Sequence, residues 1–272
     1  MASRPLPVSK LRARRRKRRL VLSVVVGVFT ILLLGAGVGL SWLPWVRIQT
    51  IAVSGNSAVS SESIEKEVRE VLQGGYFHLF ARDNVMLYPR EEIRLTLLHN
   101  FPTLSQAIIG ADSLTRLKVV VSERKAQSLW CGPSVALPSA CYLLDPQGVA
   151  FAPAADFGGK IYIEYYGPVS GTSPQQFLAP ESYKNLSATI IALKDRVTDD
   201  TLDAVEVVGE EVHVYFESGF ELMYSLQDDS AGVLERFSLA RSAAPFTTHA
   251  LSDFEYLDLR FGDKLYYKLK VE

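Results

Sequence analysis

The residue types that most often carry chemistry are few in this sequence and widely spaced. The four histidines lack the spacing of metal ligands. They are His78, His99, His213 and His249. No nucleophile elbow and no phosphate-binding glycine loop occurs in the sequence. The acidic pairs Asp199-Asp200 and Asp228-Asp229 stand beside predicted helix ends, where carboxylates usually act as caps. The sequence therefore predicts a protein that is not an enzyme and that binds no metal ion and no cofactor.

Three further groups have both a chemical and a structural interpretation. Ser54-Gly55-Asn56 could be a loop around a catalytic serine, but the same residue types make ordinary turns between a strand and a helix. Tyr165-Tyr166 and Tyr266-Tyr267 could stack on a sugar. Because neighbouring side chains of a strand point to opposite faces, we instead expect one tyrosine of each pair in the core and the other on the surface.

Only two cysteines are present, Cys131 and Cys141, ten residues apart. In an oxidising compartment two such thiols can close a loop as a disulfide. Spacing alone does not establish the geometry that a disulfide needs, so two buried free thiols remain the alternative. A metal site is disfavoured because no histidine and no second cysteine pair flanks them.

A long apolar segment follows a basic cluster near the N-terminus. Residues 20–46 carry no charge and directly follow six consecutive basic residues, Arg14 to Arg19. A bilayer core about 30 Å thick is crossed by roughly 20 apolar helical residues, and basic flanks are retained in the cytoplasm. We therefore predict a cytoplasmic tail at 1–19, a transmembrane helix at 20–43 that contacts membrane lipid, and an extracytoplasmic chain beyond it.

The competing interpretation is a cleaved signal peptide, whose apolar region is usually about 7–15 residues long. Here the apolar segment is longer and ends in Trp42-Leu43-Pro44-Trp45, an aromatic pair suited to the outer membrane interface. The basic cluster could in principle bind nucleic acid, but beside an apolar helix it more often determines topology. We expect an uncleaved anchor.

The net charge of −1 conceals an asymmetry along the chain. Nine of the 29 basic residues precede residue 20, and the first acidic residue is Glu62. The remaining chain therefore carries 20 basic and 30 acidic residues, a net charge of −10. Such a domain is poorly suited to nucleic acid or to an anionic surface. We expect protein partners and no nucleic acid.

Residues 46–125 predict a first domain with the element order β-α-α-β-β. A strand at 47–53 leads through a turn into a helix capped by Ser60 or Ser61. Pro89 marks the start of a second helix, which ends at Asn100-Phe101-Pro102. Strand-like runs at 104–109 and 114–123 form a hairpin.

Residues 126–272 predict a second domain that is mainly antiparallel β with two helices, so the fold class is α+β. Asp145-Pro146-Gln147-Gly148 has the residue set of a type I turn. Apolar spacing predicts helices near 180–196 and 229–243. Alternation predicts the strands. They lie near 161–165, within 205–217 as a pair, and at 220–224, 256–261 and 264–271.

Five segments together resemble a known family. They are IQTIAVSGNSAVSSESIEKEV at 48–68, NFPTL at 100–104, LKVVVSERKAQSLW at 117–130, CYLLDPQGVAF at 141–151 and YLDLRFGDKLYYK at 256–268. In this order, after one apolar helix, they are similar to the FtsQ/DivIB family of bacterial cell division proteins. That resemblance implies a POTRA domain directly after the membrane helix, followed by the family's β domain.

The resemblance also implies a function. It implies a non-catalytic bitopic scaffold of the divisome, located at the septum in the bacterial cell (inner) membrane with its N-terminus in the cytoplasm. The implied partners are FtsB/DivIC-like and FtsL-like bitopic proteins and other divisome proteins, through which the scaffold would regulate septal peptidoglycan synthesis. The alternative is a membrane-anchored envelope hydrolase or a POTRA-containing secretion or assembly component. That alternative predicts a clustered catalytic site or a C-terminal barrel of many strands, and the sequence shows neither.

The last predicted strand is the expected partner site. An exposed edge strand offers unpaired backbone groups that an incoming segment can extend by β-addition. The expected contact residues are Phe261, Leu265, Tyr266, Tyr267 and Lys268. The lysines of this strand also suit an edge that is protected from pairing, and the resemblance favours the partner site.

Overall fold

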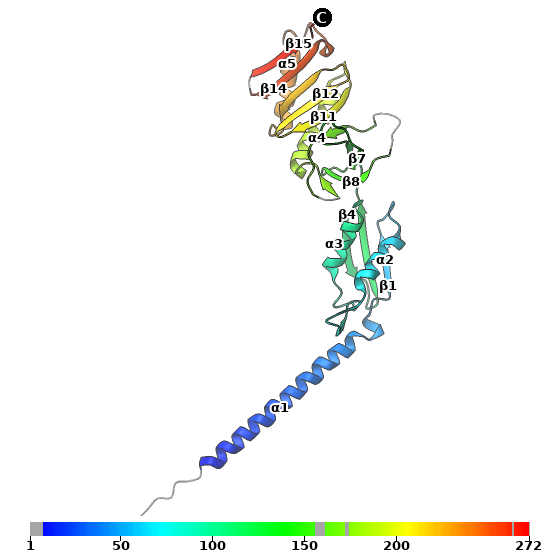
Figure 1. Cartoon of the computed structure of the whole chain (residues 1–272), viewed down its shortest axis with the longest axis vertical. Helices are drawn as coiled ribbons and strands as arrows, with labels where there is room; N and C mark the ends of the chain where they lie inside the picture. Colours follow the sequence, from blue (N-terminus) through cyan, green and yellow to red (C-terminus); the bar gives the residue numbers. More distant parts are fainter. Residues whose placement is uncertain (1–7, 156–160, 172–173, 263, 272) are drawn as a thin grey trace, which may run out of the picture. The chain divides into compact units, whose positions relative to one another are not determined.

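The computed structural model describes residues 8–155, 161–171, 174–262 and 264–271, and the side chains from residue 15 onward. It is an α+β protein with one long N-terminal helix and a large, mostly β-sheet domain (Figure 1). The chain divides into two compact units, which are described separately. The first comprises residues 1–97 and 107–121, and the second comprises residues 98–106 and 122–272.

The N-terminal helix α1 spans Val8–Ser41. Its part from Arg15 to Ser41 is 27 residues long and apolar enough to cross a membrane, and the rest of the chain does not bury its apolar window. Among the described residues it is the one helix with these properties. A helix that can span the bilayer is thus present where the sequence predicts it. Of the expected tail at 1–19, residues 1–7 and the side chains of 8–14 lie outside the description.

Beyond α1, the first unit contains two α-helices, a short 3₁₀ helix and two small sheets. In chain order its elements are η1 (Pro44–Val46), β1 (Thr50–Ser54), α2 (Ser61–Leu72), β2 (Gly75–Tyr76), β3 (Phe80–Ala81), α3 (Arg90–Asn100), β4 (Leu104–Ala111) and β5 (Arg116–Glu123). One sheet has the order β1-β5-β4, with β1 parallel to β5, and the other is the short hairpin β2-β3. The expected order β-α-α-β-β is therefore present, with a hairpin added between the helices.

Local sequence signals explain the boundaries of this unit. Ser60 caps α2, because its hydroxyl accepts a hydrogen bond from the N–H of Ser63 at 3.1 Å. Gly55 has a φ of +86°, and a Cβ there would lie 2.1 Å from the carbonyl oxygen of Val121. Only glycine fits that close turn. The first strand begins at Thr50 rather than at 47, because the N–H of Ile48 donates to the Asp83 carbonyl at 2.8 Å instead of to the sheet.

The second unit is built on a ten-stranded sheet with the order β10-β8-β7-β6-β9-β11-β12-β13-β14-β15. Its strands are β6 (Ser128–Trp130), β7 (Tyr142–Leu144), β8 (Val149–Pro153), β9 (Glu164–Tyr166), β10 (Gln175–Gln176), β11 (Leu202–Val208), β12 (Glu211–Phe216), β13 (Glu221–Ser225), β14 (Phe254–Phe261) and β15 (Lys264–Leu269). Six neighbouring pairs are antiparallel, and three are parallel: β6-β9, β9-β11 and β13-β14. The expectation of a mainly antiparallel sheet is confirmed.

Two helices complete this unit. They are α4 (Pro180–Arg196) and α5 (Ser230–Ser242), which pack against each other and bury apolar side chains with one face of the sheet. Buried residues such as Ile190, Phe237 and Leu257 belong to this core. Both helices match the ranges predicted from apolar spacing, because burial along one face is what sets that spacing.

The opposite face of the sheet is covered around β6 and β9. There Cys131 and Cys141 form a disulfide that packs with Tyr166 and Leu129 in a second, smaller cluster. Tyr165 is buried in the main core on the other face. The expectation that one tyrosine of the pair 165-166 is on the surface is therefore wrong, since the sheet is covered on both faces at this point.

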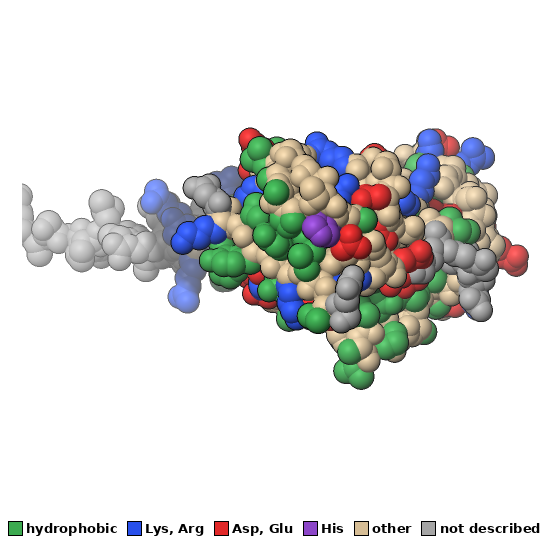
Figure 2. Space-filling view, turned by 90° about the horizontal axis from the view of Figure 1, so that it is seen from above, with side chains coloured by type: hydrophobic (Ala, Val, Ile, Leu, Met, Phe, Trp, Pro, Cys, Tyr) green, Lys and Arg blue, Asp and Glu red, His purple; other side chains and the backbone are tan. Residues whose placement is uncertain are grey.

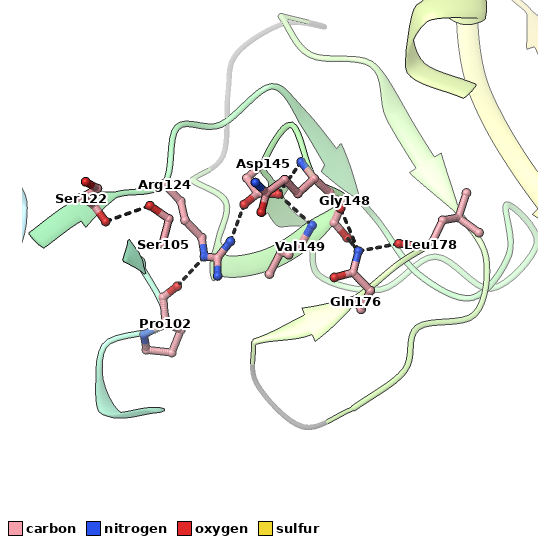
Figure 3. Close-up of polar contacts among 10 residues, drawn as sticks. Pro102, Ser105, Ser122, Arg124, Asp145, Gly148, Val149, Gln176 and Leu178 are labelled. Atoms are coloured by element: carbon pink, nitrogen blue, oxygen red, sulfur yellow. Dashed lines mark hydrogen bonds and ion pairs between the residues drawn. The ribbon is translucent and has the colours of Figure 1, made fainter. Parts of the chain in front are cut away.

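A buried ion pair fixes the turn between β7 and β8 (Figure 3). The Asp145 carboxylate accepts hydrogen bonds from the N–H of Gln147 at 2.8 Å and of Val149 at 3.0 Å. It also pairs with the guanidinium of Arg124, whose Nε donates to the carbonyl of Pro102 at 3.2 Å. Both ion-paired side chains are almost fully buried. The turn predicted at 145–148 thus forms. It is held by the ion pair of Asp145 with Arg124, which the sequence pattern does not reveal.

Candidate partner-binding edge

The expected site residues all lie on the hairpin of β14 and β15. The strand β15 is the last of the ten, and among the described strands it pairs only with β14. Every residue of β15 is exposed, as is Phe261 at the end of β14. The structure therefore brings the five expected residues together at one open sheet edge. These are Phe261, Leu265, Tyr266, Tyr267 and Lys268.

The direction of the backbone groups of β15 follows from its pairing with β14. The N–H of Lys270 donates to the carbonyl of Asp253 at 2.9 Å, so it points toward β14. Both irregularities of this ladder place the extra residue in β14. The N–H groups along β15 therefore point alternately toward β14 and away from it without interruption. The N–H groups of Leu265 and Tyr267 consequently point outward, to the free edge, and that of Tyr266 points inward.

The side chains of β15 are divided between the two faces of the sheet. Tyr267 packs edge-on against Phe246 and Phe254, with ring centroids 5.5 and 6.0 Å apart, and so lies on the side of the main core. Tyr266 packs against Phe261 on the other side, at 5.2 Å. Both tyrosines nevertheless remain about half exposed, at 44% and 49%. The expectation of one buried and one exposed tyrosine is wrong for this pair. Among the described strands none lies beyond β15, so the outer side of both rings stays uncovered.

Lys268 of the last strand and Lys270, just beyond its end, are engaged within the chain. Lys268 pairs with Glu255 at 2.5 Å, and this hydrogen bond raises the pKa of its ammonium group. The ammonium of Lys270 donates to the carbonyls of Ser218 at 2.6 Å and Ser252 at 2.9 Å. These lysines therefore lie against β14 and the neighbouring turns, and the outward backbone groups of Leu265 and Tyr267 stay accessible.

A charged network lies on the sheet face next to Tyr266. The Arg260 guanidinium pairs with Asp258 and with Glu211, each at 2.6 Å, and lies 5.7 Å from the centre of the Phe261 ring. Burial alone would raise the pKa of Asp258, but hydrogen bonds from the side chain and backbone of Arg260 outweigh it and lower that pKa. The lowered pKa favours the ionised carboxylate of Asp258, and its pairing with Arg260 holds the end of β14 in place.

His213 extends this network along the same face. Its Nδ1 lies 2.6 Å from a carboxylate oxygen of Glu221, and its Nε2 lies 3.5 Å from Glu211. The hydrogen bond to Glu221 raises the pKa of the imidazole, although burial opposes the shift. Alternating charged residues in β12 and β14, otherwise apolar strands, are the sequence signal that could have revealed this network.

The other chemically suggestive residues serve the structure. Among the described residues no group of three or more His, Cys, Asp or Glu side chains is arranged to hold a metal ion. The carboxylate of Asp229 caps α5 by accepting from the N–H of Gly232 at 2.6 Å. Asp199 pairs with Arg241 and Asp228 with Arg236. No protein-family model matches the sequence, and no curated protein is significantly similar to it.

The surface drawn in Figure 2 combines several kinds of side chain. Hydrophobic side chains gather there, with acidic side chains and histidine beside them and basic side chains around the margin. The open β15 edge presents both a backbone ladder and exposed aromatic side chains. These are the two features that β-addition uses.

Proposed function

We propose that this chain is a non-catalytic, single-pass membrane scaffold of the bacterial divisome. It recruits or regulates FtsB/DivIC-like and FtsL-like bitopic proteins and thereby septal peptidoglycan synthesis. The observation that carries this proposal is the open, apolar edge of β15 at the end of a sheet, in a chain that also has one helix able to span a membrane. The motif order that resembles the FtsQ/DivIB family supplies the identity of the partners.

The binding mechanism follows from the geometry of the edge. A partner segment pairs with the outward N–H and C=O groups of β15 and extends the sheet by one strand. Leu265, Tyr267 and Leu269 alternate onto one face, and Tyr266 and Lys268 onto the other. Backbone pairing then supplies affinity, whereas the two rows of side chains select the partner.

Proline substitution in the edge strand tests the mechanism. Leu265→Pro removes an N–H that points outward, so the folded protein should lose binding to the purified FtsB/DivIC-like protein of the same organism. Tyr266→Pro is the matched control, because it removes an N–H directed at β14 and should lower the stability of the fold as well. Binding of the full chain in detergent or nanodiscs, with thermal unfolding measured in parallel, separates the two effects.

An unchanged affinity of the folded Leu265→Pro variant would place the partner site elsewhere. Topology is checked separately, by adding protease to cells stripped of their outer layers. The proposal expects digestion of the chain beyond about residue 47 and survival of the tail, because basic residues oppose translocation. Recovery of a soluble protein that starts near residue 40 would instead show cleavage and overturn the anchor.

A further inference from the structure

The outer end of α1 is tied to the hairpin β2-β3 by side-chain and backbone contacts. The indole N–H of Trp42, one residue beyond the helix, donates to the carbonyl of Leu79 at 2.7 Å. The side-chain amide of Asn84 donates to the carbonyl of Ser41 at 3.1 Å. The N–H of Val85 donates to the carbonyl of Val46 at 2.8 Å. Three segments of the first unit therefore meet where the apolar helix ends.

These segments carry large apolar side chains that nothing in the described chain covers. Phe77 is 90% exposed, Met86 82%, Trp45 75% and Leu79 51%. Scattered exposed apolar residues are normal on a soluble domain, but these four are carried by segments whose backbones meet, and a contiguous apolar patch marks a binding surface. We refer to Trp45, Phe77, Leu79 and Met86 as the apolar collar.

The backbone holds part of the collar outward at a cost in strain. Phe77 and His78 have φ values of +52° and +60°. Histidine is among the residues that tolerate this region, but phenylalanine seldom adopts it. A tight turn that only reverses the direction of the chain usually has asparagine and glycine at its two central positions, because both tolerate positive φ. Strained loop residues that persist in a fold point to a functional constraint.

We propose that the apolar collar inserts into the outer leaflet of the same bilayer that α1 crosses. The inference rests on the membrane anchor of the proposed function. The occupant is lipid because the collar is continuous with the end of the membrane span: Trp42 immediately follows α1 and bonds to the hairpin itself. Aromatic side chains also favour the membrane interface, and amphipathic surfaces bury their apolar side about 5–10 Å into it.

Contact between the apolar side chains and the lipid, rather than attraction to anionic headgroups, drives this insertion. The nearby guanidinium groups are already paired within the unit, Arg47 with Asp83 at 2.7 Å and Arg82 with Glu92 at 2.5 Å. Insertion of the collar fixes how the first unit stands on the membrane, since a single helix by itself leaves the unit free to tilt.

Tryptophan reporters test the insertion in the full-length protein. Phe77→Trp and Met86→Trp each add one indole to the collar on a separate segment, and both replace one large apolar side chain with another. Ala58→Trp is the control, because the exposed Ala58 follows the end of β1 that points away from α1. Each variant is reconstituted into phosphatidylcholine vesicles with and without brominated phosphatidylcholine, and the emission of the wild type is subtracted.

The collar reporters should lose most of their added emission to the bromine atoms, whereas the control reporter should keep it. Flotation with the vesicles and unchanged thermal unfolding establish that each variant is anchored and folded. If a floating, folded protein keeps the emission of both collar reporters, the insertion is wrong and the anchor stands. If that unquenched emission is also shifted to the blue, a protein surface covers the collar instead, and the insertion is equally wrong. Failure of the wild type to float would overturn both the anchor and the insertion.

Discussion

The two edges of the ten-stranded sheet differ in length and in how they are covered. At one edge β10 consists of two residues, and its Gln176 exchanges backbone hydrogen bonds with Ser170 at 2.8 and 2.9 Å. At the other edge β15 has six exposed residues, and its outward N–H groups have no neighbouring strand in the described chain. Short, covered edges prevent pairing with other chains, and long, open ones invite it. The difference indicates that only the β15 edge is available to a partner.

The two edges also differ in what holds them. The Gln176 side chain donates to the carbonyls of Gln147 at 2.8 Å and Leu178 at 2.5 Å, which ties β10 to the turn that Asp145 organises (Figure 3). The β15 edge is held by its ladder with β14, by ring contacts and by lysines on its margin. Disturbing each edge should therefore affect different properties: stability at the first and binding at the second.

The largest effect is expected at the covered edge. Asp145→Ala leaves the buried guanidinium of Arg124 without its partner and frees the N–H groups of the turn, so the free energy of unfolding should fall by about 3 kcal/mol or more. Glu65→Ala is the control, because it removes an exposed ion pair with Arg69 worth less than about 1 kcal/mol. Urea unfolding measures both. Equal small losses would mean that the buried pair does not hold the turn.

The disulfide should stabilise the fold by restricting the conformations that the unfolded chain can adopt. Replacing Cys131 and Cys141 together by serine opens a ten-residue loop, and the free energy of unfolding should fall by up to about 3 kcal/mol. Partner binding at the β15 edge should survive in the fraction that stays folded. Mass spectrometry of unreduced, alkylated protein provides the direct check. Two alkylated thiols in freshly purified wild-type protein would contradict the disulfide.

Binding, rather than stability, should respond to changes in the open edge. Tyr267→Ala removes a half-exposed ring from the face shared with Leu265, and truncating a tyrosine that anchors an interface costs about 2 kcal/mol or more of binding free energy. Because Tyr267 also contacts Phe246 and Phe254, some stability should be lost with it. Tyr266→Ala is the matched comparison and should impair binding mildly. Calorimetric titration of both variants and the wild type ranks the two faces, and wild-type affinity in both variants would show that neither tyrosine anchors the partner.

The smallest effect is a dependence of stability on pH through His213. Since its pKa is raised in the folded state, its stabilising contribution is complete below the ordinary pKa of about 6.5 and is lost as the pH rises through the raised value. The free energy of unfolding of the wild type should therefore decrease over that range. His213→Gln should flatten the decrease in urea titrations at several pH values. An identical slope in both proteins would exclude His213 as its source.

Several elements could be predicted from the sequence because the forces that form them act within a few residues. The limits of α4 depend on apolar spacing, and the start of α2 depends on the Ser60 cap. The turn at 145–148 depends on a glycine of positive φ. The hairpin of β14 and β15 belongs with them, since strand alternation and a short connection specify it. The sequence therefore predicted that these residues form the last hairpin of the chain, whereas their role in binding a partner stays a prediction.

The tertiary structure alone decided which surfaces are covered. The sequence offers the pairs 165-166 and 266-267 as equivalent, yet the first is buried on both faces of the sheet and the second is half exposed on both. Sheet position makes the difference: β9 lies inside the sheet beneath a disulfide cluster, and β15 lies at its edge. The ion pair of Arg124 with Asp145 and the bond from Trp42 to Leu79 join residues 21 and 37 positions apart. Local patterns determined helices, turns and the long apolar helix, whereas burial and long-range pairing depend on the packed chain as a whole.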